Sequence, residues 1–500
     1  MISSLANIDV AFKALAPRTQ DWASILPEIA VAGLALLCLV QAMLLPAKLR
    51  WLIPASARIG LGLVIAMTVI PSTAWSPAEA TVSFAGLTKI EPAIATYIRI
   101  TFLLSALLTS FLAVRFFRER AAPIADYHHI LLVVTAAFML LAQSNHFVML
   151  FVSLETAAVG LYVLVGYLRR SAASLEAGVK YLVSGGLSSA LLLMGIVLVY
   201  GSLGAPGVDS LNFDQIKLAL AAGKATALTM VGIALIIGGA AFKLGAFPFH
   251  AWIPDVYQGA PTPTTAFLGT ASKAAGAFTL LLLVTGPFAP LSAKFGPLLA
   301  AGAILTLLAG NLAALATTDI KRVLALSGVS HAGFLLAAIA AVVISGDIRE
   351  GSALLAIYLI AYSIGTFLVA QALAEMPVAA DHQRPLLGLR GLLRRSPILA
   401  SALGFGLGSL AGVPPSIGFF AKLLILLLLA KLKLWWLFGA ALLSVAISIH
   451  YYFGILREAV VRPTENQAEI VPLEVSFTSR FIIGALSAAT ILGSLFFYEA

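Results

Sequence analysis

Four ionisable residues lie inside or beside long apolar runs of the sequence. They are Glu155 in "MLFVSLETAAVGLY", Lys243 in "AFKLGAFPFHAWIPDVYQGAP", Lys273 in "FLGTASKAAGAFTLL" and Lys422 in "SIGFFAKLLIL". A charge at the centre of a membrane helix costs about 2.5–3.5 kcal/mol on insertion scales, so such groups normally face a polar interior. Desolvation favours a neutral lysine and a nearby carboxylate favours the ammonium. One carboxylate and three lysines can therefore hold and pass a proton as coupled titrating sites.

Each of these residues also has a structural interpretation. Glu155 could be a neutral carboxyl hydrogen-bonded to a neighbouring helix, while Lys243 and Lys422 could extend from near a helix end toward an interface. Lys273 lies roughly eleven residues into its run, too deep for its stem to reach either interface. The small residues on both sides of Lys273 predict close helix packing around it.

Two further residues are candidates of lower rank, and two cations are not candidates. His331 in "LSGVSHAGFLL" lies inside a run, where a neutral histidine bonded to a hydroxyl is the usual case. Lys180 in "LEAGVKYL" is near the start of a run, which favours an interfacial position, and Glu176 lies on the same helical face. Lys321 and Arg322 are interpreted as ordinary loop cations.

The composition is that of an integral membrane protein. Hydrophobic residues make up 61% of the chain and charged residues 11%, against roughly 25% charged in soluble domains. The net charge of +9 is spread over short loops, which is not the pattern of a nucleic-acid-binding face. One cysteine, dispersed histidines and the absence of Walker, HExxH and GxSxG motifs indicate no metal or cofactor on this chain. Linked redox chemistry must then take place elsewhere.

Apolar runs of about 20 residues, the length of a membrane span, predict an all-α polytopic bundle of about fourteen helices. They lie near 25–45, 52–71, 97–116, 127–143, 146–168, 175–200, 226–247, 262–286, 296–316, 322–344, 351–374, 397–430, 433–454 and 479–498. Loops after odd-numbered runs hold about twice as many cations as the others. This bias predicts that they are cytoplasmic and that both termini are periplasmic, although Lys13 and Arg18 argue locally against it.

Two of the runs contain helix-breaking residues. Pro248 interrupts the seventh run just after Lys243, and Pro414 and Pro415 interrupt the twelfth just before Lys422. The breaks are five runs apart, and a repeat with an odd number of helices must be inverted in its second copy. We therefore expect helices 1–3 in 1–120, a first five-helix repeat in 121–290, an inverted second repeat in 291–455, and a loop with helix 14 in 456–500. The alternative is two unrelated proline kinks.

Three blocks of the sequence resemble a known family. "AFKLGAFPFHAWIPDVYQGAPTPTTAFL", "GNLAALATTDIKRVLALSGVSHAGFLL" and "SLAGVPPSIGFFAKLLIL" resemble the antiporter-like subunits of respiratory complex I, the proton-pumping NADH–quinone oxidoreductase. The likeness extends over roughly residues 125–430 and is greatest to the subunit N group. It implies a multi-pass protein of the bacterial inner membrane that contacts lipids, a neighbouring antiporter-like subunit and small membrane subunits. NADH, FMN, iron–sulfur clusters and quinone are expected on other subunits.

The resemblance also implies roles for individual residues. Glu155 and Lys243 would form a switchable ion pair, Lys273 the central relay and Lys422 the site near the exit, with His331 on the connecting axis. One alternative function is a subunit of a multi-subunit sodium/proton antiporter, which shares the helical core. Another is a structural spacer, which leaves the deeply placed Glu155 and Lys273 unexplained.

Overall fold

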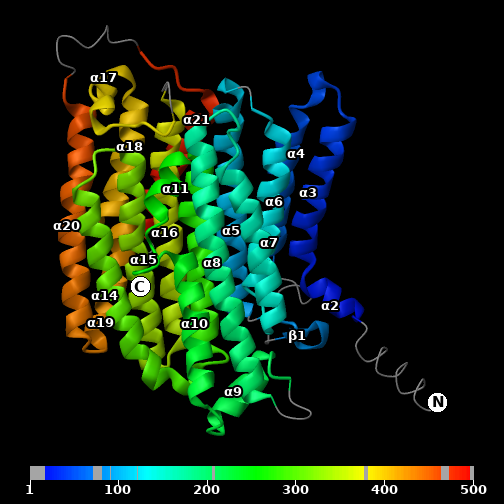
Figure 1. The fold of residues 1–500 in the computed structure, drawn as a ribbon. Coiled ribbons are helices and arrows are strands. Elements are labelled where there is room, and N and C mark those ends of the chain that lie inside the picture. The colour runs from blue at the N-terminus through cyan, green and yellow to red at the C-terminus, as the bar shows by residue number, and fades with distance from the viewer. Residues whose placement is uncertain are drawn as a thin grey trace.

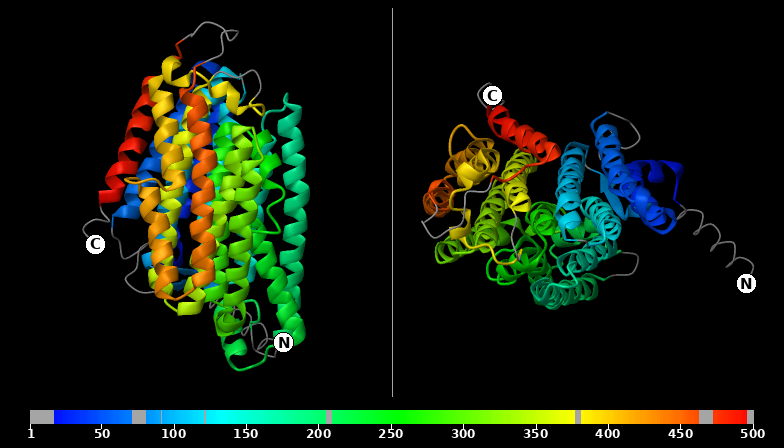
Figure 2. Two further views of the ribbon diagram at one scale, coloured as in Figure 1. Left: turned by 90° about the vertical axis from the view of Figure 1, so that its left-hand side faces the viewer. Right: turned by 90° about the horizontal axis from the view of Figure 1, so that it is seen from above.

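The chain forms a bundle of approximately parallel helices in a computed structural model (Figure 1) that describes residues 17–70, 81–90, 92–120, 122–204, 209–376, 381–462 and 472–495. Seen from above, the bundle is elongated: the N-terminal helices lie at one end and the C-terminal third at the other (Figure 2). Among the described residues, thirteen helices are long and apolar enough to cross a membrane.

The crossing helices follow the predicted runs closely. Those before the first break are α3 (Leu26–Leu44), α4 (Leu52–Val69), α5 (Pro92–Glu119), α6 (Ile124–Leu141), α7 (Phe147–Val165), α8 (Ala172–Leu203) and α10 (Ala227–Leu244). The eighth crossing is continuous through α12 (Thr262–Phe267), a π-helical segment η3 (Leu268–Ser272) and α13 (Lys273–Thr285). The later ones are α14 (Ser292–Leu315), α15 (Ile320–Ser345), α16 (Ile348–Glu375), α20 (Trp435–Val460) and α21 (Phe477–Leu495).

The remaining crossing, the twelfth in chain order, is made of two shorter helices. They are α18 (Pro397–Ala411) and α19 (Ile417–Lys431), one above the other in Figure 1. The remaining short elements are α2 (Thr19–Ser24), α9 (Phe213–Ala221), α11 (Ile253–Gly259) and α17 (Leu392–Arg395), with 3-10 turns η1 (Ala47–Leu49), η2 (Phe84–Gly86), η4 (Ala289–Leu291) and η5 (Leu386–Leu389). Fourteen crossings agree with the number of apolar runs.

Both predicted helix interruptions are present. Helix α10 ends at Gly245, which has a φ of 79°, and α18 ends at Gly412, with a φ of 83°. These left-handed residues terminate a helix without the steric cost that a Cβ would bring. The chain resumes as α11 at Ile253 in the first case and as α19 at Ile417 in the second. The bonds before Pro248 and Pro415 are cis.

Two helices form the centre of the bundle. Nearly every side chain of the crossing that ends in α13 is buried, and the same is true of α15. The peripheral helices leave many apolar side chains exposed, as expected for surfaces that meet lipid or neighbouring proteins. The central helices carry Lys273 and His331, so both residues lie in the protein interior.

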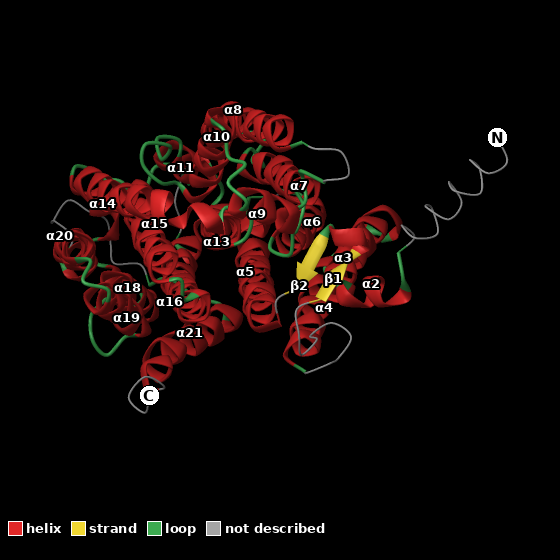
Figure 3. Ribbon diagram, turned by 90° about the horizontal axis from the view of Figure 1, so that it is seen from below, coloured by secondary structure: helices red, strands yellow, loops and turns green. Residues whose placement is uncertain are grey.

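A small β-hairpin departs from the all-α prediction. Strands β1 (Thr81–Ser83) and β2 (Thr88–Ile90) pair antiparallel, with Val82 opposite Lys89, and β1 contacts α2 (Figure 3). The amide of Lys89 donates to the carbonyl of Gln143, and that of Asn145 to the carbonyl of Leu87. Strands of three residues are too short to show an alternating sequence pattern. The backbone groups along the outer edge of the hairpin form their hydrogen bonds with the turn between α6 and α7, which is distant in the sequence.

The division into two repeats remains a prediction, and the helix packing supports it. In the first unit α6 packs on α7 and α8 packs on α10. The helices in the matching positions of the second unit pack in the same way: α14 on α15, and α16 on α18. The same neighbours therefore recur five helices apart.

Candidate functional site

Lys273 lies in the middle of the bundle, at the point where the π-helical segment gives way to α13. Its side chain is 2% exposed, and its ammonium donates to the carbonyl oxygen of Gly328 on α15 at 2.7 Å. A Cβ added at Gly328 would lie 3.2 Å from the hydroxyl of Tyr362 and 3.7 Å from Nζ of Lys273. The bare glycine therefore leaves room for the hydroxyl and the ammonium beside one carbonyl. π-Helical segments are frequent at functional sites.

Lys243, in the last turn of α10, has a shielded ammonium. Its Nζ makes no hydrogen bond within the part of the chain that the structure describes, and Oγ1 of Thr279 on α13 has none either. Both residues line a cavity of about 20 Å³, which is enough for a water molecule. A Cβ at Gly276 would lie 2.5 Å from the amide nitrogen of Leu244, so α13 packs directly on the end of α10.

Glu155 lies on α7, half-buried against α8. Its Oε1 accepts a hydrogen bond from the hydroxyl of Ser189. The salt bridges found among the described residues do not include a Glu155–Lys243 pair within 4.0 Å. The structure therefore holds the predicted switchable pair apart, with the carboxylate bonded to a hydroxyl and the lysine uncommitted.

Lys422 is bonded to the other half of its own broken helix. Its ammonium donates to the carbonyl oxygens of Leu410 at 2.8 Å and Ala411 at 3.0 Å, at the end of α18. The last carbonyls of a helix lack intrahelical partners and carry partial negative charge. Lys422 therefore caps α18 from α19 across the break. The side chain is 4% exposed.

His331 on α15 adjoins the Lys422 site. Its Nδ1 lies 2.7 Å from the hydroxyl of Tyr358, its Nε2 lies 3.4 Å from that of Tyr452, and its ring packs on Tyr362 at 4.6 Å. His331 and Lys422 line one cavity of about 10 Å³. A histidine with a hydroxyl at each ring nitrogen can accept a proton at one and release a proton from the other.

Lys180 does not belong to this interior group. Its ammonium pairs with Glu176 at 2.8 Å and with Asp255 at 2.9 Å, and its side chain is 46% exposed. Arg322 binds the other oxygen of Asp255 at 2.9 Å. The two ion pairs of Asp255 connect α8 and α15 to the short helix α11 that follows the first break, and the Glu176–Lys180 pair lies within α8.

The interpretation of Lys321 as a loop cation is wrong. Lys321 is 0% exposed and pairs with Asp381 at 3.1 Å, and Asp381 also pairs with Arg384 at 2.7 Å. The sequence did not reveal this because Asp381 is 60 positions away. Burial of Lys321 is a tertiary effect: its side chain turns inward from the first turn of α15.

A buried ion pair in the N-terminal helices also escaped the sequence analysis. Arg99 on α5 contacts Glu28 on α3 at 2.7 Å, and the amide of Gln143 donates to the same carboxylate. Both charged side chains are 2% exposed. Their positions at the edges of the first and third apolar runs were a usable signal, by the argument applied to Glu155.

Metal ligands do not gather anywhere in the described ranges. No group of three or more His, Cys, Asp or Glu side chains there has the arrangement to hold a metal ion. The polar groups nearest to Lys273 and Lys422 are tyrosines, hydroxyls and His331. This set can bind and transfer protons.

Comparisons with known proteins agree on one family. The family model described as "NADH:quinone oxidoreductase/Mrp antiporter, TM" matches residues 144–448. NADH-quinone oxidoreductase subunit N 1 of Opitutus terrae is 45% identical over 465 residues, covering 91% of this chain and 90% of the relative. Subunit N of Desulforamulus reducens is 32% identical, covering 94% and 95%.

Solved structures show the same fold. A chain of respiratory complex I from Thermus thermophilus superposes with a TM-score of 0.75 at 28% identity, over 94% of this chain and 97% of that one. A chain of the Mrp complex from Dietzia sp. gives 0.80 at 20% identity over 95% of each, a likeness of fold alone. On the family match and the identity to curated relatives, this chain belongs to the antiporter-like membrane subunits of NADH-quinone oxidoreductase, in the subunit N group.

Proposed function

We propose that this chain is a membrane-arm subunit that translocates protons, driven by quinone reduction in other subunits of an NADH–quinone oxidoreductase. The observation that carries this proposal is the placement of Lys273. Lys273 lies on the central helix α13, which packs on the broken helix α10, and its ammonium bonds to α15, which packs on α19 of the other broken helix. Each broken helix presents a lysine to the interior. Family membership supports the same conclusion.

The three lysines differ in how their ammonium groups are held, which suggests an order for the relay. Lys243 has only a water-sized cavity beside it, whereas Lys273 is bonded to one carbonyl and Lys422 to two. An ammonium that releases its proton to cavity water becomes a neutral amine and can accept the next proton. Because neighbouring ammonium groups repel each other, a proton on one site favours release from the next.

Glu155 controls the first step in this proposal. When its carboxylate leaves Ser189 and approaches Lys243, it stabilises the ammonium; when it returns to Ser189, that stabilisation is lost. His331, between hydroxyls of Tyr358 and Tyr452, connects the centre to the Lys422 cavity. Lys180 holds α11 in place from the surface.

The redox chemistry lies on other subunits in this proposal, where NADH, FMN, iron–sulfur clusters and quinone are bound. The chain sits in the bacterial inner membrane with both termini on the periplasmic side. Its partners are lipids, a neighbouring antiporter-like subunit and small membrane subunits. Exposed apolar side chains around the bundle provide the surfaces for these contacts.

Glu155→Ala and Lys243→Ala test the relay in the assembled complex. We expect both variants to assemble, and to lose proton pumping and the coupled quinone reductase activity. Lys294→Ala is the matched control, because Lys294 is exposed at the start of α14. Normal pumping by both test variants would refute the relay and leave a structural spacer as the better reading.

Co-purification separates the two transport functions. An affinity tag on this chain should bring down flavin- and iron–sulfur-containing subunits, detected by absorbance and mass spectrometry. Recovery of a complex without them would favour the multi-subunit sodium/proton antiporter.

A further inference from the structure

A buried ionic cluster joins the start of α15 to the junction between α11 and α12. The ammonium of Lys321 donates to the carbonyl oxygen of Ala260 at 2.6 Å and to Asp381 at 3.1 Å. Asp381 also accepts from the guanidinium of Arg384 at 2.7 Å, and from the amide and hydroxyl of Thr262 at 3.1 and 2.8 Å. We call Lys321, Asp381 and Arg384 the junction cluster.

The cluster matches the polarity of the two helix ends that it holds. Ala260 closes α11, whose terminal carbonyls attract a cation, and Thr262 opens α12, whose first amides attract an anion. Lys321 and Asp381 supply these charges and neutralise each other. Burial alone would raise the pKa of the Asp381 carboxyl, but the adjoining Lys321 and Arg384 cations hold it well below its usual range. The carboxylate is therefore charged at neutral pH.

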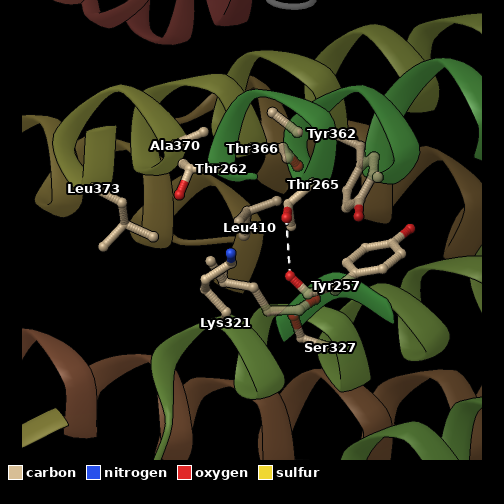
Figure 4. Close-up of a pocket in the computed structure, with 13 residues that line it drawn as sticks. Tyr257, Thr262, Thr265, Lys321, Ser327, Tyr362, Thr366, Ala370, Leu373 and Leu410 are labelled. Atoms are coloured by element: carbon tan, nitrogen blue, oxygen red, sulfur yellow. Dashed lines mark hydrogen bonds between the residues drawn. The ribbon is translucent and has the colours of Figure 1, made fainter. Parts of the chain in front are cut away.

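A cavity of about 30 Å³ lies directly inside the junction cluster (Figure 4), and its mostly apolar lining carries several hydroxyl groups. Lys321 lines one end, Tyr362 and Tyr257 line the other, and hydroxyls of Thr265, Thr366 and Ser327 lie along it. This volume accepts at least one water molecule, and the lining provides hydrogen-bond partners for it.

Tyr362, at the inner end of the cavity, lies close to the central lysine. The hydroxyl of Tyr362 and Nζ of Lys273 both lie against Gly328. Tyr362 and Leu410 also line the smaller cavity beside Lys422. The cavity therefore extends from Lys321 of the junction cluster to Tyr362, whose hydroxyl is near Lys273.

We propose that the junction cluster is a closure over a water route to Lys273. Separation of Lys321 from Asp381 frees the α11–α12 junction and opens the cavity, so that water can exchange a proton with the Lys273 ammonium through Tyr362. The three cluster residues are positioning residues, because none of them touches Lys273. This inference rests on the proposed proton relay and adds a gated access point to it.

Accessibility of Ser327 tests the closure without measuring transport. Ser327 lines the cavity and is 2% exposed, and Ser327→Cys replaces its hydroxyl with a thiol in nearly the same space. Cys38 is the only native cysteine of the chain and would be removed as Cys38→Ala. Ag⁺ is small enough to follow water, and it binds a thiol as thiolate with release of one proton. Modification of the position in the assembled complex is followed by mass spectrometry of its peptide.

The rate of Ag⁺ modification decides the outcome. With the cluster intact we expect slow modification, and with Asp381→Asn an increase of at least about ten-fold, because a buried lysine loses its charged partner. Glu350→Gln, which removes the exposed Lys431–Glu350 pair, should leave the rate unchanged. Equal rates with and without Asp381→Asn overturn the closure, as does fast modification in the intact cluster.

Thr262→Val provides a second, milder opening if Asp381→Asn does not assemble. It removes one hydrogen bond to Asp381 and keeps every charge, so a smaller increase in rate supports the closure and an unchanged rate overturns it. Lys273→Ala distinguishes the two proposals: normal pumping by that variant refutes the relay, while the labelling result still reports on the closure.

Discussion

The two broken helices place a lysine next to an interruption in opposite ways. Both breaks begin with a left-handed glycine, Gly245 in one and Gly412 in the other. In the twelfth crossing, Lys422 follows the break and reaches back to the carbonyls that end α18. In the seventh, Lys243 precedes the break and its ammonium has no partner among the described residues.

This difference shows that a helix break has two separate structural consequences. It exposes carbonyls that can bind an ammonium, and it leaves space that can hold water. Lys422 uses the first and Lys243 lies beside the second. We infer that Lys422 is the stable resting site and that Lys243 is the site whose charge depends on a partner that moves, namely Glu155.

Substitution by arginine separates capping from proton transfer. Arginine keeps the positive charge and the donors but does not release its proton in proteins. We expect Lys243→Arg and Lys422→Arg each to lower proton pumping in membrane vesicles by about 10²-fold or more, the scale of a lost acid–base group. If the Lys422→Arg complex assembles and pumps protons at the full rate, Lys422 acts as a helix cap and does not transfer protons.

Removal of the two ammonium groups should affect the stability of the complex differently. Lys422→Met leaves the carbonyls of Leu410 and Ala411 without their donor, so we expect a loss of about 1–3 kcal/mol in unfolding free energy. Lys243→Met removes no hydrogen bond, and it should leave stability unchanged or raise it. Thermal unfolding of the purified complex in detergent measures both. Equal destabilisation would mean that Lys243 is also held by a partner.

The two glycines provide a smaller and more specific comparison. Alanine in a left-handed position costs about 1–2 kcal/mol at either site. At Gly412 the new Cβ would lie 3.0 Å from Cδ of Lys422, and at Gly245 it would lie 2.2 Å from Cδ1 of Ile253. We expect Gly245→Ala to lower thermal stability more, and Gly412→Ala to lower pumping per assembled complex more. The reverse order of pumping defects would contradict the assigned role of the Lys422 stem.

The mildest change is at the cavity beside Lys243. Thr279→Val removes the unpartnered hydroxyl and keeps the shape, so we expect pumping to fall by about two- to five-fold if a water bridges Thr279 and Lys243. Thr270→Val is the matched control, because among the described residues its hydroxyl bonds to the carbonyl of Ala266 in its own helix and to no other group. Initial pumping rates at equal subunit content measure both. Equal rates in the two variants would exclude the bridging water.

Several features of the fold could be predicted because their causes are local. Run length determines which segments can cross a bilayer, and the positions of Pro248 and Pro414 mark the interruptions. The depth of Lys273 follows from its distance to both ends of its run. The burial of Lys321 could not be predicted in this way, because a cation in the first turn of a helix faces either solvent or the interior, depending on which segments pack beside it.

The sequence by itself determined the number of crossings, both helix breaks and the lysines that lie beside them, since hydrophobicity and backbone restrictions act over a few neighbouring residues. Only the tertiary structure decided what each ammonium binds. The carbonyl of Gly328 for Lys273, the end of α18 for Lys422, Asp381 for Lys321 and a bare cavity for Lys243 all depend on how separate helices pack. These partners determine how strongly each ammonium keeps its proton. They lie on segments far apart in the sequence, so sequence patterns do not identify them.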